Sequence, residues 1–176
     1  QGLLGGLTQV LNTKEFSMGM SRGVSPETVM GITDAVYYTL YGKSLANEDL
    51  SIYILTDKEY LQWIQIECQD TLSRLSARLH QAYRENCARL EGFAGFITQW
   101  RSQHRIVIRG QRPPIQVLAA ISHEIGHFRQ SLDNPSLDDQ LGSLDLLALQ
   151  EAQAYAYQVV FLRTLETLTG QDLLLY

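Results

Sequence analysis

Two histidines four positions apart lie in the stretch ISHEIGHFRQ, residues 121–130. In an α-helix, residues four apart lie on one face, one turn above each other. His123 and His127 would therefore direct their imidazoles toward a common point, with Glu124 directly after the first of them. Two imidazoles at this spacing can bind one zinc ion. The stretch thus predicts a helix that presents a metal site.

The opposite face of this helix is apolar. We expect the helix to run from about Ile115 to Leu132, after the break GQRPP at residues 110–114. At 100° per residue, five apolar side chains cluster away from the histidines, and Glu124 lies on the flank between the two faces. The five are Leu118, Ile121, Ile125, Phe128 and Leu132. One face would pack in a core while the other presents the imidazoles.

A catalytic zinc site usually has three protein ligands and one water, so a third ligand is required. The chain has only two other histidines, His80 and His104, and both precede the motif. We therefore expect a carboxylate as the third ligand. If the two histidines bind no metal, they are simply a polar face of an amphipathic helix.

The H-E-x-x-H pattern at residues 123–127 resembles the zincin metallopeptidases, and the carboxylate points to their gluzincin branch. The third ligand of that branch is a glutamate on a separate downstream helix. Glu151, in LQEAQAYAYQ, matches that position: it follows His127 by 24 residues, behind a polar loop. Ala148, Ala152 and Ala154 would let the two helices approach closely. Without a metal, Glu151 would be a solvated helix glutamate.

Asp133 is the competing carboxylate, six residues after His127. The metzincin branch of the zincins has its third ligand at this place, after a glycine that turns the chain out of the helix. Here Gln130, a good helix former, stands where that glycine would be. We therefore favour Glu151 over Asp133.

The resemblance implies a reaction. Zn²⁺ held by His123, His127 and Glu151 would activate a water, and Glu124 would act as general base toward a peptide or protein substrate. Tyr155 and Tyr157, on the same helix as Glu151, are candidate donors to the oxyanion, although a packing role suits either one. The longer thermolysin-type signature has an aspartate four residues after the third ligand, where this chain has Tyr155. Support for a ligating histidine must therefore come from elsewhere.

The remaining pattern predicts an α+β fold in one zincin-like domain, residues 1–176. A mostly helical part, residues 1–91, includes a helix begun by Ser25 and Pro26, and the strand LSIYILT at residues 50–56. Residues 92–176 would form a small mixed sheet, the active-site helix, and a C-terminal helix at about 144–169 that carries the third ligand. The strands GFAGFIT (92–98) and HRIVIR (104–109) suit the zincin sheet, whose edge strand pairs with an extended substrate, and equally an ordinary hairpin. The resemblance covers about residues 92–168.

Cys68 and Cys87 both fall in a stretch, residues 57–91, that reads as one long helix. Nineteen residues along a straight helix span roughly 28 Å, which forbids a bond between them. We therefore expect two free, structural thiols. A disulfide would require this segment to fold back as a hairpin.

Composition limits the range of functions. The formal net charge of −5 argues against nucleic acid as a main partner, and no apolar run is long enough for a membrane span. The chain opens with Gln1, so we expect a processed or excised piece of a longer protein. The leading hypothesis is a zinc metallopeptidase. The alternatives are an inactive zincin-like metal-binding domain with a recognition or regulatory role, and a helical interaction domain in which the motif is accidental.

Overall fold

A computed structural model describes residues 25–100, 103–135 and 144–170. The fold is mixed α+β and mostly helical, with one small three-stranded sheet in the order β1-β3-β2. Strand β1 (Leu50–Leu55) runs parallel to β3 (Gln103–Arg109), and β2 (Gly95–Trp100) is antiparallel to β3. The predicted strands are thus confirmed, and β2 forms one edge of the sheet. The turn between β2 and β3 and most of the predicted polar loop before residue 144 lie outside the described residues.

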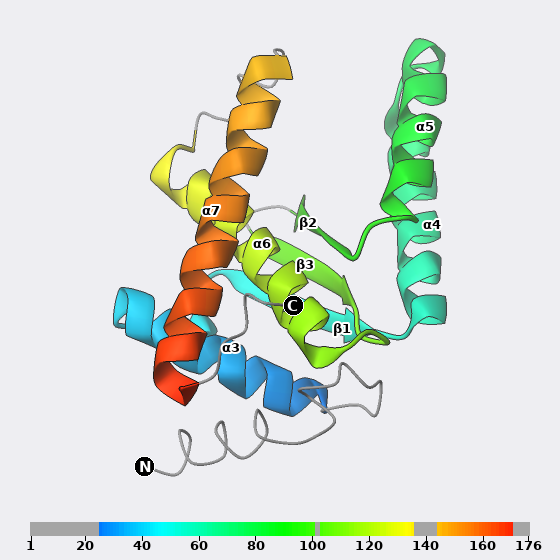
Figure 1. Cartoon of the computed structure of the whole chain (residues 1–176). Helices are drawn as coiled ribbons and strands as arrows, with labels where there is room; N and C mark the ends of the chain where they lie inside the picture. The colour runs from blue at the N-terminus through cyan, green and yellow to red at the C-terminus, as the bar shows by residue number, and fades with distance from the viewer. Residues whose placement is uncertain (1–24, 101–102, 136–143, 171–176) are drawn as a thin grey trace.

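Helices cover both faces of the sheet (Figure 1). Helices α3 (Pro26–Tyr41), α6 (Pro114–Asp133) and α7 (Leu144–Thr169) form one layer, and α4 (Asp57–Arg74) and α5 (His80–Leu90) form the other. Two short 3₁₀ helices, Leu45–Asn47 and Ala77–Leu79, connect these elements. None of the described helices is long and apolar enough to cross a lipid bilayer.

The alternation of side chains along β3 gives the molecule two apolar cores. Ile106 and Ile108 point into the core made with α3, α6 and α7. Val107, between them, points to the other side and packs with Phe96 against α4 and α5. Because successive side chains of a strand point to opposite faces, β3 is buried on both sides. The sheet therefore fixes where α6 lies, and with it the two histidines.

Side-chain caps begin two of the helices, and the start predicted at Ser25 is confirmed. Ser25 caps α3 by accepting a hydrogen bond from the Thr28 backbone N–H, and Gly42 ends the helix with a left-handed φ of 71°. Thr56 and Glu59 cap each other's backbone N–H groups at the start of α4. These side chains satisfy amide groups that the first helical turn leaves unpaired.

The prediction of one long helix over residues 57–91 is wrong, and so is the prediction of free thiols. The backbone becomes extended at Leu75, with ψ 151°, and the chain folds back as the antiparallel pair α4 and α5. This hairpin brings the two Cα atoms of Cys68 and Cys87 to 6.2 Å, and the two residues form a disulfide. No Gly or Pro marks the turn. Burial of one side of α4 against the sheet and α5 outweighs the helical preference of the sequence.

The buried carboxylate of Glu48, in the loop after α3, contacts side chains of α3 and α6. It accepts a hydrogen bond from the Tyr37 hydroxyl at 2.6 Å, pairs with Lys43 at 2.6 Å, and lies 3.9 Å from Arg129. Burial alone would raise the pKa of Glu48, but the hydrogen bonds from Lys43 and Tyr37 lower it below the ordinary value. The ionised form therefore stabilises the fold.

We expect Glu48→Gln to lower the free energy of unfolding at pH 7 by about 1.5–3 kcal/mol, the typical contribution of hydrogen bonds to a charged group. Because the folded-state pKa is lowered, this stabilisation is complete above the unfolded pKa of about 4.3 and is lost as the pH falls through the folded value. Denaturant unfolding of both proteins at pH 7 and near pH 3 measures the effect. A difference as large at pH 3 as at pH 7 would contradict the assigned charge.

Candidate metal centre

The apolar face of α6 anchors the candidate site. Leu118, Ile121, Ile125 and Phe128 are fully buried, as the helical wheel predicted. Leu132 is 42% exposed, so its assignment to the core was wrong. It lies in the last turn, next to the Asn134 cap, where the packing of the helix ends. Three turns of α6 are therefore fixed in the core.

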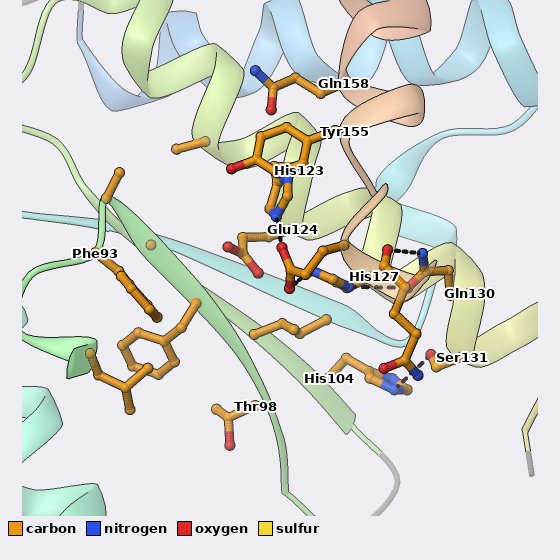
Figure 2. Close-up of a pocket in the computed structure, with 18 of the residues that line it drawn as sticks. Phe93, Thr98, His104, His123, Glu124, His127, Gln130, Ser131, Tyr155 and Gln158 are labelled. Atoms are coloured by element: carbon orange, nitrogen blue, oxygen red, sulfur yellow. Dashed lines mark hydrogen bonds and ion pairs between the residues drawn. The ribbon is translucent and has the colours of Figure 1, made fainter. Parts of the chain in front are cut away.

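His123 and His127 of α6 (Figure 2) come together with Glu151 of α7. The Nε2 atom of His123 lies 3.3 Å from one carboxylate oxygen of Glu151, and Nε2 of His127 lies 3.2 Å from the other. The potential ligand atoms of the three residues all lie within 4.8 Å of one another, and the described residues form no other such group.

The alternative carboxylate is elsewhere. Asp133 ends α6, its side chain is 72% exposed, and it accepts from Arg129 at 3.4 Å. The helix continues through Gln130 without a turn, as its helical preference predicted. His80 and His104 also lie outside the group of three. Of the two carboxylates considered as a third ligand, Glu151 is the one that contacts the histidines.

The three side chains lie close enough to one another to share one metal ion. Two donors that each lie about 2.05 Å from a tetrahedral zinc are about 3.3 Å apart. The two histidine-to-carboxylate distances, 3.3 and 3.2 Å, are close to that separation, and each runs to a different oxygen of Glu151. Burial, followed by the neighbouring His127, lowers the pKa of His123, although Glu151 opposes the shift. A neutral imidazole offers a lone pair, which is the form that binds a metal.

Gly126 lets α7 reach the histidines. A Cβ atom at this position would lie 3.0 Å from the Ala154 Cα and 3.1 Å from the Tyr157 Cβ. Of the alanines predicted at this contact, Ala154 is fully buried, whereas Ala148 and Ala152 are exposed. Gly126 was not among the residues predicted to form this contact. The signal was its position inside a helix, where glycine costs about 1 kcal/mol relative to alanine.

Gly126→Ala should therefore push α6 and α7 apart and displace Glu151 from the histidines. Overpacking of this kind typically costs about 1–3 kcal/mol in the free energy of unfolding, and we expect weaker metal binding as well. Gly31→Ala is the matched control: Gly31 lies in α3, and its added Cβ would meet nothing within 4 Å. That change should stabilise the protein by about 0.5–1 kcal/mol. Denaturant unfolding of the two variants compares them, and equal stabilisation by both would contradict the close contact.

Glu124 is buried beside the three ligands and is not one of them. Burial, then the negative charge of Glu151, raises the pKa of Glu124 to about 8, although a hydrogen bond from the Ile97 backbone opposes the shift. A cation held by the neighbouring ligands would lower this pKa again, because it stabilises the carboxylate. The side chain is therefore placed to take up and release a proton.

These residues lie in a cleft of about 980 Å³ between β2, α6 and α7. Its lining includes Phe93, Ile97, Gln99, Glu124 and Tyr155. The Arg109 N–H donates to the Ala94 carbonyl. In an antiparallel pair, every second residue hydrogen-bonds to the partner strand. The backbone groups of Gly95, Ile97 and Gln99 therefore face away from β3. An edge whose outward backbone groups are not used by β3 therefore runs along the cleft, and Ile97 directs its backbone toward Glu124.

The two candidate tyrosines point in different directions. Tyr155 lines the cleft, and its ring centroid lies 4.5 Å from that of His123 (Figure 2). Tyr157 is mostly buried and stacks against Tyr41 of α3 at 6.2 Å. Of the pair, Tyr155 is the one available to a molecule in the cleft.

Comparison with protein-family models, curated proteins and solved structures finds no match for this chain. What the site can do therefore follows from its own residues: two imidazoles, a carboxylate and a second, buried carboxylate. Such a set could hold a divalent metal ion that takes nitrogen and oxygen ligands.

Proposed function

We propose that the chain is a zinc-dependent metallopeptidase of the zincin type, gluzincin-like, that hydrolyses peptide bonds with a metal-activated water. The observation that carries the proposal is the convergence of His123, His127 and Glu151 on one point, beside the buried Glu124, in an open cleft. Three protein ligands leave one position of a tetrahedral zinc for water, as catalytic sites require.

Each residue then has a distinct role. His123, His127 and Glu151 would hold the ion, which would supply a water of lowered pKa and polarise the substrate carbonyl. Glu124 takes the proton of that water and delivers it to the leaving amine. The Tyr155 hydroxyl is the candidate donor to the oxyanion, since this side chain lies over His123 at the cleft.

The edge of β2 supports a peptide as the substrate. An extended chain can pair with the outward backbone groups of Gly95 and Gln99, as one more strand of the sheet. That pairing would place a peptide bond between the sheet edge and the three ligands. Phe93, half exposed in the lining, offers an apolar contact for a substrate side chain.

Zinc content and peptide cleavage test the proposal together. Elemental analysis of the purified protein should give near one zinc per chain, and mass spectrometry of an incubated peptide library should show cleavage that a chelator stops and added zinc restores. Zinc without cleavage would favour the alternative, a metal-binding domain of recognition or regulatory function. A protein that takes up no zinc at neutral pH would refute both and leave the motif as a polar helix face.

A further inference from the structure

One glutamine connects the two ligand helices at the candidate site. The Oε1 atom of Gln130, on α6, lies 3.0 Å from Nδ1 of His127. Its Nε2 atom donates to the backbone carbonyl of Gln150, on α7, at 2.7 Å. Gln150 directly precedes Glu151, so the Gln130 side chain contacts one metal ligand and the residue next to another (Figure 2).

The carbonyl at Gln150 decides the direction of this chain of hydrogen bonds. A backbone carbonyl only accepts, so the NH₂ group of Gln130 must face it. The Oε1 atom of Gln130 therefore faces His127, and since an amide oxygen also only accepts, the hydrogen must be on Nδ1 of His127. The lone pair of a neutral ring is then on Nε2, the atom that faces Glu151.

We propose that Gln130 is a positioning residue for the metal: it holds His127 in the tautomer and orientation that offer Nε2, and it holds α7 beside it. The inference rests on the metal site of the proposed function. It gives one of the two histidines, His127, a hydrogen-bonded support from α6 itself. Hydrogen-bonded partners of this kind typically change metal affinity about 10- to 100-fold.

Three variants separate the orienting role from simple attachment of the helices. Gln130→Leu removes both hydrogen bonds. Gln130→Glu keeps an acceptor for His127 Nδ1–H but cannot donate to the Gln150 carbonyl. Gln153→Leu is the matched control, since Gln153 is exposed and accepts from the same Gln130 amide at 3.4 Å. Zinc affinity is measured by competition with a chromogenic chelator, and thermal unfolding monitors the fold of each protein.

We expect zinc to bind about 10- to 100-fold more weakly to Gln130→Leu. Gln130→Glu should stay within about threefold of the native protein, and Gln153→Leu should be unchanged. If Gln130→Glu is as weak as Gln130→Leu, the residue only attaches the helices and the inference is overturned. Because zinc is the readout, a native protein that binds zinc without cleaving peptides would refute the peptidase and leave this inference standing. A native protein that takes up no zinc would overturn both.

Discussion

Glu124→Gln should nearly abolish peptide cleavage while leaving zinc bound. We expect kcat to fall about 10²- to 10⁴-fold, the usual contribution of a general acid–base residue. The amide keeps the shape of the side chain, and its oxygen can still accept the hydrogen bond from the Ile97 backbone. It cannot take up a proton, so the water would lose its base. Because Glu124 is not one of the three ligand residues, the metal should stay.

The measurement is kcat on a cleaved peptide, together with zinc content, for the native protein and the variant. Glu85→Gln is the matched control, because Glu85 is exposed on α5, where it accepts a hydrogen bond from Gln81 at 3.3 Å. The Glu124→Gln protein is purified in the same way, so that a contaminating peptidase would appear as cleavage in both preparations. Turnover within a few-fold of the native rate, with zinc present, would exclude Glu124 as the base. Loss of zinc from this variant would instead assign it a role in holding the ion.

The two histidines of the candidate site could be predicted because their arrangement depends only on spacing within one helix. Helical geometry alone places His123 and His127 on one face, whatever the rest of the chain does. Glu151 could be chosen because a helix that continues through Gln130 removes Asp133. The structure has this continuous helix, and Glu151 lies beside both histidines. The strands and the helix caps follow in the same way from short patterns of side chains.

What could not be predicted depends on contacts between distant segments. The turn at Leu75 contains no Gly or Pro, and it exists because α4 and α5 pack as a pair and bring Cys68 to Cys87. Helical periodicity likewise could not show that Leu132 lies past the packed part of α6. The role of Gly126 needed the position of Ala154 in space, which no spacing along the chain gives.

Glu151→Ala should remove most of the zinc. We expect a loss of affinity larger than the roughly 10- to 100-fold cost of losing an outer hydrogen-bond partner, because a direct ligand disappears. Glu151 is also the side chain that contacts both histidines, at 3.3 and 3.2 Å. Zinc stoichiometry by elemental analysis after gel filtration, followed by chelator competition, measures the change.

Asp133→Ala provides the decisive control, since Asp133 and Glu151 are the two alternative third ligands. Asp133 is exposed and pairs with Arg129, so its removal should leave zinc content unchanged. If zinc is instead lost from Asp133→Ala and kept in Glu151→Ala, the end of α6 must rearrange on metal binding and the gluzincin-like assignment is wrong. If both variants keep one zinc, the two histidines bind it with water or another side chain. Loss from Glu151→Ala alone leaves the three-residue site between α6 and α7 as the one that fits.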